Sequence, residues 1–157
     1  MNIPKAGEIM KKGIYSIDAA ITLLEAAQMM LKTGTSLLVV TDNSKPVGVL
    51  SSGELFNSFC LHVAGHFPDK LTKEHMMAEK IEAVNRRSKE FNGLKVRDIM
   101  TPKIKTIKSS QGIDEAVSVM KANNIRRLMV EDEKGNLVGV LTRNDTLCRL
   151  MESLSNV

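Results

Sequence analysis

Tryptophan is absent from this sequence, and only 3% of its 157 residues are aromatic. Proteins that bind single-stranded nucleic acids stack bases on aromatic side chains, so this scarcity argues against that class. Cysteine is also scarce, because Cys60 and Cys148 are too few for a disulfide framework. We expect both cysteines to be small, buried and reduced side chains, and we predict a cytoplasmic protein.

Long apolar runs are missing as well. No stretch approaches the roughly 20 apolar residues of a membrane-spanning helix. The opening residues, MNIPKAGEIMKK, lack the apolar core of a signal peptide. The sequence contains neither a P-loop nor a G-x-G-x-x-G motif, and its three histidines are confined to residues 62–75. Because no nucleophile is paired with a base, we predict no enzymatic activity. Because no long apolar run is present, we expect no membrane association.

The sequence instead contains one unit that is used twice. Residues 137–145, LVGVLTRND, are similar to residues 47–54, VGVLSSGE. Upstream of these, Glu8-Ile9-Met10 matches Asp98-Ile99-Met100 at an offset of 90 residues. The apolar positions keep their order over about 50 residues, which predicts two copies of one structural unit.

Each copy predicts the element order strand, helix, strand, strand, helix. The first copy has expected strands at residues 14–17, 37–41 and 47–50, a helix at 22–32, and a closing helix after Ser51. The second copy has expected strands at 104–107, 128–131 and 137–141, a helix at 113–122, and a closing helix after Thr142. Three strands with two helices leave one sheet face uncovered. We therefore predict an α+β fold in which two pseudo-twofold-related repeats pack sheet to sheet.

A longer segment separates the two copies. We divide the chain into a first repeat at residues 1–60, an insert at 61–95 and a second repeat at 96–157. Apolar positions among charges at residues 73–87 predict an amphipathic helix in the insert, with a break at 67–69. Residues 70–97 hold eight basic and four acidic side chains, an excess that equals the net charge of +4 for the whole chain. The positive charge is therefore a local patch.

The acidic residue that follows each apolar strand has two interpretations. Thr142 and Asp145 stand three residues apart at a strand–helix junction, as in a capping box, and Ser51 and Glu54 fit the same pattern. Alternatively, the carboxylate accepts hydrogen bonds from the two hydroxyls of a ribose, which is a strong and directional contact. The spacing leaves both interpretations open.

These motifs resemble those of a tandem pair of cystathionine-β-synthase (CBS) domains, also called a Bateman module. The residues that carry the resemblance are 96–102 (VRDIMTP), 125–132 (IRRLMVED) and 137–145 (LVGVLTRND). The first repeat departs from the pattern, with Lys11-Lys12 in place of Thr-Pro and Glu54 in place of Asp. The resemblance implies a regulatory module that binds AMP, ADP, ATP or another adenosine compound in clefts between the repeats. It implies no required cofactor and no metal.

The resemblance also assigns site residues. The nucleotide-binding residues carried over from the family are Asp145, Thr142, Asn144, Arg126, Arg127, Gly13, Ile14 and Tyr15. In this assignment Asp145 holds the ribose hydroxyls, residues 13–15 hold the adenine, and the two arginines face the phosphates. The alternative for the arginines is surface charge at a strand edge. A second, weaker site would comprise Ser51, Glu54, Lys103 and Lys105, because glutamate is one methylene longer than aspartate.

Partners follow from the same resemblance. We expect a homodimer that forms through helices, with Met29-Met30 and Val119-Met120 offering either adaptable apolar surface or core packing. The signal would pass to an effector protein or through rearrangement of the dimer. One alternative is a ligand-free structural or interaction module. Another is a metal- or nucleic-acid-binding insert, since His62 and His66 are four residues apart and the insert is basic.

Overall fold

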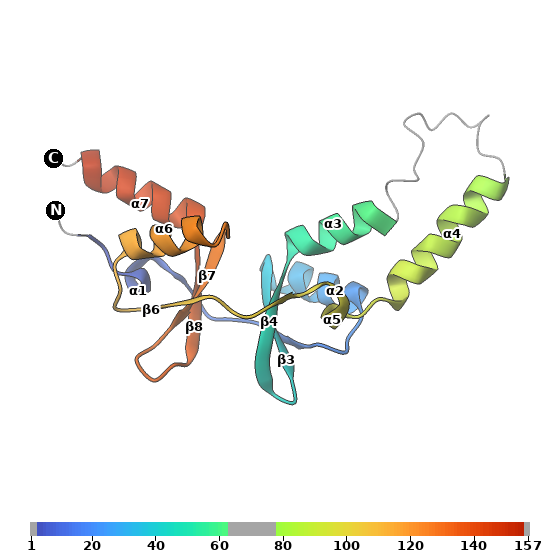
Figure 1. Ribbon diagram of the computed structural model, residues 1–157, viewed down its shortest axis with the longest axis horizontal. Coiled ribbons are helices and arrows are strands. Elements are labelled where there is room, and N and C mark those ends of the chain that lie inside the picture. Colours follow the sequence, from blue (N-terminus) through green and yellow to red (C-terminus); the bar gives the residue numbers. More distant parts are fainter. Residues whose placement is uncertain (1–2, 63–77, 156–157) are drawn as a thin grey trace. The chain divides into compact units, whose positions relative to one another are not determined.

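The structure is a computed structural model that describes residues 3–62 and 78–155 (Figure 1). It contains two compact units. Unit 1 combines Met1–Ile14 with Ile104–Val157, and unit 2 is the continuous stretch Tyr15–Lys103. Each unit contains one four-stranded sheet with helices, so the predicted α+β class is confirmed. Within the described ranges, no helix is long and apolar enough to cross a membrane.

Unit 2 is built around a sheet with the strand order β2-β3-β4-β5. Its strands are β2 (Ser16–Asp18), β3 (Leu37–Asp42), β4 (Lys45–Ser51) and β5 (Thr101–Pro102). Its helices are α2 (Leu23–Thr33), α3 (Ser52–His62), α4 (Ala78–Gly93) and α5 (Val96–Ile99). Strand β2 runs parallel to β3, and the other pairs are antiparallel. The buried core includes Leu23, Ala26, Leu38, Val40 and Leu50.

Unit 1 repeats this arrangement with the strand order β1-β8-β7-β6. Its strands are β1 (Lys11–Lys12), β6 (Thr106–Lys108), β7 (Arg127–Glu131) and β8 (Leu137–Thr142). Its helices are α1 (Ala6–Ile9), α6 (Ile113–Ala122) and α7 (Arg143–Ser155). Strand β6 is parallel to β7, while β1 and β7 are both antiparallel to β8. The two units therefore share one topology, as the internal repeat predicts.

The compact units cut across the sequence repeats, because each repeat's opening segment lies with the other repeat. Ala6 at the start of α1 donates its N–H to the carbonyl of Gln111 (2.8 Å) and is fully buried in unit 1. At the matching place, Val96 at the start of α5 donates to Ile21 (3.0 Å) and is fully buried in unit 2. This exchange adds β1 and β5 as the fourth strands, which the sequence pattern did not predict.

The first long helix of each unit turns its methionines inward. Met30 on α2 and Met120 on α6 are 8% and 2% exposed, so both belong to the cores. The core-packing alternative is therefore correct for these two side chains. The N-terminus of α2 is closed by a capping box between Thr22 and Glu25, and Gly34 ends the helix with a φ of 68°.

Within the predicted insert at residues 61–95, the structure describes helix at residues 61–62 and 78–93. Helix α3 continues to His62, and α4 covers Ala78–Gly93 before the chain enters α5. The expected break at residues 67–69 lies outside the described residues, as do His66 and His75.

Candidate functional site

Asp145 lies in the first turn of α7, directly after β8, and its carboxylate turns back toward Thr142. Oδ2 accepts hydrogen bonds from the Thr142 hydroxyl (2.6 Å) and the Thr142 backbone N–H (3.3 Å). The Asp145 N–H donates in return to Thr142 Oγ1 (3.2 Å). The capping-box interpretation of this motif is thus observed. Oδ1 accepts no hydrogen bond from the described residues, so half of the carboxylate can still accept donors from a ligand.

Glu54 occupies the matching position at the start of α3 but uses both carboxylate oxygens. Oε2 accepts from the Ser51 backbone N–H, and the Glu54 N–H donates to Ser51 Oγ (3.4 Å). Oε1 accepts from the hydroxyl of Thr101 on β5. The extra methylene of glutamate lets one side chain cap its helix and also reach the neighbouring strand. Glu54 therefore has less acceptor capacity left for a ligand than Asp145 has.

The N-terminal segment brings two predicted adenine-binding residues into the same unit as Asp145. Strand β1 pairs with β8, with Lys11 opposite Val140, and the N–H of Gly13 donates to the carbonyl of Val138 (3.0 Å). Gly13 has a φ of +85°, which a glycine adopts without strain. Gly13 and Ile14 thus belong to unit 1, whereas Tyr15 begins unit 2 and is 48% exposed.

The two predicted phosphate-facing arginines lie at the edge of unit 1 where α7 begins. Arg127 pairs across the sheet with Thr142, and Arg126 immediately precedes β7. The N–H of Arg143 donates to the Arg126 carbonyl (2.9 Å), which fixes this backbone beside the capping box. Arg126 is exposed and Arg127 is half-buried. Of the eight residues assigned to the nucleotide site, seven therefore fall in unit 1, with Tyr15 the exception.

Sequence reasoning missed Arg143, which lies inside the LTRND motif. Its guanidinium donates to the carbonyl of Ile125 (3.1 Å) and so ties the start of α7 to the segment before β7. Asn144, which was predicted, is exposed beside it. The sequence did indicate this residue, because Arg143 stands between Thr142 and Asp145. A long side chain at that position lies near the junction of β8 and α7.

The four residues of the predicted second site are divided between the units. Ser51, Glu54 and Lys103 lie in unit 2, while Lys105 lies in unit 1, where its carbonyl accepts from the N–H of Met129 (3.1 Å). Lys103 has a φ of 68°, at the position that matches Gly13. A lysine in this left-handed conformation is strained, so the two matching turns differ in chemistry and in backbone freedom.

Two glycines were also missed, although they determine how the exchanged strands fit. A Cβ on Gly139 would lie 2.6 Å from the Lys11 carbonyl oxygen, and one on Gly48 would lie 2.5 Å from that of Thr101. Both distances are too short for a side chain, so each glycine permits a close approach of β1 or β5. The signal was a glycine at the same place in both buried strands.

The metal alternative receives no support from the described part of the insert. The His62 ring donates from Nδ1 to the Ser58 carbonyl of its own helix (2.8 Å). Among the described residues, no group of three His, Cys, Asp or Glu side chains could hold a metal ion. Cys60 is half-buried and Cys148 is exposed, so neither cysteine is fully buried as expected.

Known proteins share both the motifs and this topology. The profile of the CBS domain family matches residues 6–60 and 96–152. An uncharacterized protein, MJ1426 from Methanocaldococcus jannaschii, is 31% identical over 147 residues, which cover 89% of this chain and 87% of that protein. Three further curated relatives are longer, and this chain spans 38%, 63% and 61% of their lengths.

Two solved structures show the same fold. The crystal structure of CBSX2 in complex with AMP superposes with a TM-score of 0.62 at 20% identity, covering 96% of this chain and 98% of that one. The CBS domain pair of protein MJ0100, in complex with 5′-methylthioadenosine and S-adenosyl-L-methionine, gives a TM-score of 0.65 at 21% identity, covering 97% and 98%. At this identity the similarity establishes the fold alone.

Proposed function

Because the chain belongs to the CBS domain family, with two such domains in tandem, we propose that it is a regulatory module that senses an adenosine nucleotide and performs no catalysis itself. The observation that carries the proposal is the junction of β8 and α7 in unit 1. There the Asp145 carboxylate caps α7 through Oδ2 only, in the unit that also holds Gly13, Ile14 and both arginines. A ribose hydroxyl can donate to Oδ1 while the cap remains in place.

The ligand class follows from the chemistry of the related complexes. AMP, 5′-methylthioadenosine and S-adenosyl-L-methionine, which are bound by the two similar proteins, share adenine and a ribose. They differ at the 5′ position. Arg126 and Arg127 present two guanidiniums at the edge of unit 1, and guanidinium forms bidentate hydrogen bonds with phosphate oxygens. We therefore favour AMP, ADP or ATP over uncharged or cationic adenosine compounds.

Unit 2 would bind such a ligand more weakly. Both oxygens of Glu54 already accept hydrogen bonds from Ser51 and Thr101. A ribose would have to displace at least one of these donors, and the loss of that hydrogen bond would reduce the net free energy of binding. One good site in unit 1 and a weak one in unit 2 is the expected stoichiometry.

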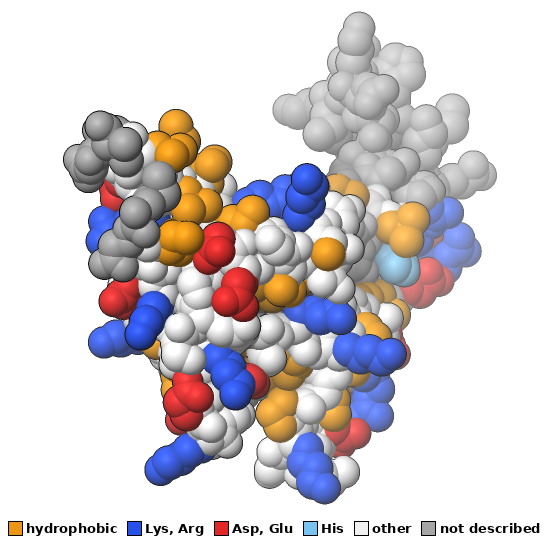
Figure 2. All heavy atoms as spheres, turned by 60° about the vertical axis from the view of Figure 1, so that its left-hand side comes forward, with side chains coloured by type: hydrophobic (Ala, Val, Ile, Leu, Met, Phe, Trp, Pro, Cys, Tyr) orange, Lys and Arg blue, Asp and Glu red, His pale blue; other side chains and the backbone are white. Residues whose placement is uncertain are grey.

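A regulatory module needs a surface through which it contacts another protein, and α7 has an exposed apolar one. Leu147, Met151 and Leu154 are 53%, 61% and 63% exposed and recur at helical spacing, which makes an apolar stripe. Figure 2 shows apolar side chains gathered on the surface of unit 1. We propose that this stripe, rather than the buried methionines, forms a homodimer contact. Nucleotide binding would then act on the dimer, or on an effector protein, by favouring one of two arrangements.

Calorimetry with AMP, ADP, ATP and S-adenosyl-L-methionine tests the proposal. We expect binding of at least one nucleotide in the micromolar range, about −8 kcal/mol. Asp145→Asn should weaken binding ten- to hundredfold, the loss of about 1.5–3 kcal/mol for a hydrogen bond to a charged group. Glu54→Gln is the matched control, because it perturbs the equivalent cap and should leave the tighter site unchanged. Absence of binding to all four compounds would contradict the proposal.

The second candidate is a ligand-free structural or interaction module. The complete capping box between Thr142 and Asp145 favours it, since helix capping alone accounts for both residues. In that case Asp145→Asn would lower the stability of the protein by about 1 kcal/mol and change nothing else. The same calorimetric series, combined with urea denaturation, separates the two candidates.

A further inference from the structure

Unit 1 contains a pocket between the end of α6 and the start of α7, which we name the cationic pocket. Its volume is about 330 Å³, within the range of about 300–1,000 Å³ that is typical of small-ligand sites. Its lining residues are Val117, Met120, Lys121, Asn124 and Arg143. None of the residues assigned to the nucleotide site is among them, so the pocket has no role in the function proposed above.

Local structure brings these residues together. The three lining residues of α6 share one face, because they stand at positions i, i+3 and i+4 of the helix. Asn124 follows in the turn that ends α6, where it has a φ of 50° and donates its N–H to the Lys121 carbonyl (3.2 Å). Arg143 is the first residue of α7, and its guanidinium donates to the carbonyl of Ile125 (3.1 Å). That bond holds the guanidinium one residue beyond Asn124.

The pocket has two positive charges, and none of the described residues that line it is acidic. Lys121 is exposed and forms no ion pair with any described residue. The guanidinium of Arg143 donates to a neutral carbonyl, which leaves its charge uncompensated. The amide of Asn124 offers a further hydrogen-bond donor. An ammonium, a guanidinium and an amide around one cavity are suited to an anion.

The carbonyl groups at the end of α6 could oppose an anion, because a helix C-terminus has partial negative charge on its unpaired carbonyls. In this protein the carbonyls of Val119, Met120 and Lys121 each accept a hydrogen bond from an N–H of the following turn, at 2.9–3.2 Å. The Val119 carbonyl also accepts from the side-chain amide of Asn123 (2.8 Å). The negative end of this helix is therefore largely satisfied by the protein itself.

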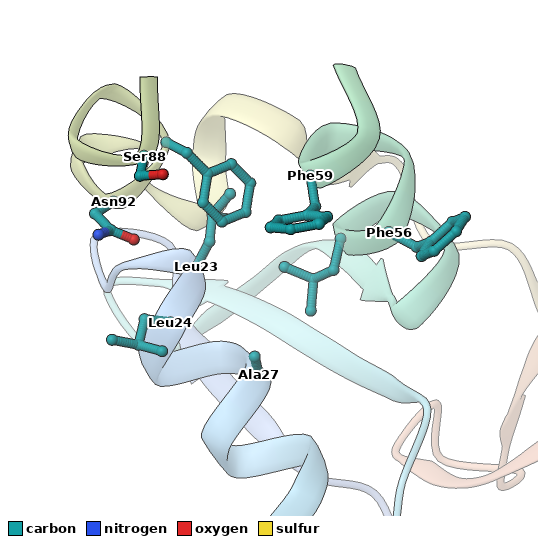
Figure 3. Close-up of a pocket in the computed structure, with 9 residues that line it drawn as sticks. Leu23, Leu24, Ala27, Phe56, Phe59, Ser88 and Asn92 are labelled. Carbon is teal, nitrogen blue, oxygen red and sulfur yellow. The ribbon is translucent and has the colours of Figure 1, made fainter. Parts of the chain in front are cut away.

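The matching place in unit 2 has neither of these charges. Lys121 corresponds to Leu31, which is 84% exposed, and Arg143 corresponds to Ser52. A pocket of about 440 Å³ in unit 2 lies among α2, α3 and α4, and its lining is apolar apart from Ser88 and Asn92 (Figure 3). Because the two units share one topology, the cationic pocket results from the side chains of unit 1 and not from the fold.

We propose that the cationic pocket binds a small organic phosphate monoester. At neutral pH a phosphate monoester has a charge of about −1.5 to −2, which matches the two cations of the pocket, whereas a single carboxylate would leave one of them unpaired. Guanidinium forms bidentate hydrogen bonds with phosphate oxygens, and lysine adds a point charge. Val117 and Met120 offer apolar contact to the organic part, so a monoester is favoured over inorganic phosphate.

Calorimetry of the full chain with phenyl phosphate and inorganic phosphate tests the proposal. Phenyl phosphate should bind saturably, and inorganic phosphate more weakly. Lys121→Gln should weaken phenyl phosphate binding about fivefold, the upper end for an exposed charge pair. Lys134→Gln is the matched control, because it removes an exposed lysine from the turn between β7 and β8, outside the pocket, and should bind like the wild type.

Titrations in the presence of saturating AMP, and of the Asp145→Asn variant, separate this pocket from the nucleotide site. Neither change should alter phenyl phosphate binding. If AMP displaces phenyl phosphate, the pocket is part of the nucleotide site and the proposal is overturned. If AMP does not bind at all, the comparison of Lys121→Gln with Lys134→Gln still decides the matter, so the two proposals fail separately.

Three further results would overturn the proposal. The first is the absence of saturable phenyl phosphate binding to the wild-type protein. The second is an equal effect of Lys121→Gln and Lys134→Gln, which would reduce the contact to general surface charge. The third is displacement of phenyl phosphate by phenol, which would place the ring in the apolar pocket of unit 2.

Discussion

Thr101 donates its hydroxyl hydrogen to Oε1 of Glu54, and this bond joins the two-residue strand β5 to the first turn of α3. The matching positions in unit 1 are Lys11 and Asp145. Thr101 lies opposite Val49 and Lys11 lies opposite Val140, and each acidic residue follows its partner valine by five positions. The exchanged strands therefore carry a threonine in one unit and a lysine in the other at corresponding positions, and the Thr101 hydroxyl reaches the acidic residue of its own unit.

The Thr101–Glu54 contact should be measurable as a coupling energy. Removing the hydroxyl in Thr101→Val should destabilise the protein by about 1 kcal/mol, the usual net contribution of one hydrogen bond. In a double-mutant cycle with Glu54→Gln, urea denaturation should give a coupling of about 0.5–1 kcal/mol. Additive effects of the two substitutions would show that the contact does not stabilise unit 2.

The glycines opposite the exchanged strands should not tolerate a methyl group. Gly139→Ala places a Cβ 2.6 Å from the Lys11 carbonyl oxygen, and we expect a loss of about 1–3 kcal/mol in the free energy of unfolding. Gly93→Ala is the control, because no atom lies within 4 Å of its added Cβ. Thermal denaturation of both variants checks this, and equal melting temperatures would contradict the close fit.

Low pH should reduce the free energy of unfolding, because the capping box of α2 depends on an ionised Glu25. Hydrogen bonds from the Thr22 backbone and hydroxyl hold the pKa of Glu25 below its ordinary value. A depressed folded-state pKa gives stability that is complete above the unfolded pKa of about 4.3 and is lost as the pH falls through the folded value. Glu25→Gln should therefore remove part of the acid-induced loss between about pH 5 and pH 3.

Equilibrium unfolding at several pH values checks that effect. Glu115→Gln is the matched control on α6, which begins after Gly112 without a side-chain cap. If Glu25→Gln and Glu115→Gln follow the same pH profile, the Thr22 cap is not the source of the acid dependence.

The apolar stripe of α7 should control self-association. Met151→Glu places a charge at the centre of the stripe formed with Leu147 and Leu154, and we expect it to convert a dimer into a monomer. Light scattering coupled to size exclusion measures the mass directly. Lys134→Glu, in the turn between β7 and β8, is the control and should keep the wild-type mass. A dimer that survives Met151→Glu must form through another surface.

Much of each unit could be predicted from local patterns. The helix expected at residues 113–122 is observed over Ile113–Ala122, and the closing helices begin directly after Ser51 and Thr142, as expected. These elements are set by hydrophobic spacing and by capping residues, which act over one or two turns. The match to the CBS family profile confirms the prediction of a CBS domain pair. This prediction was possible because the motifs of the family are contiguous in the sequence.

The sequence alone determined that two copies of one unit exist and where an acidic residue would open the last helix of each, because periodicity and capping are local properties. Only the tertiary structure decided which segments complete each unit. Strands β1 and β5 have two residues each, too short for any period, and their pairing with β8 and β4 depends on partners far away in the chain. Tertiary structure also decided that the second carboxylate oxygen of Glu54 accepts from Thr101, whereas among the described residues only Oδ2 of Asp145 accepts a hydrogen bond, since that difference arises from side-chain reach across neighbouring strands.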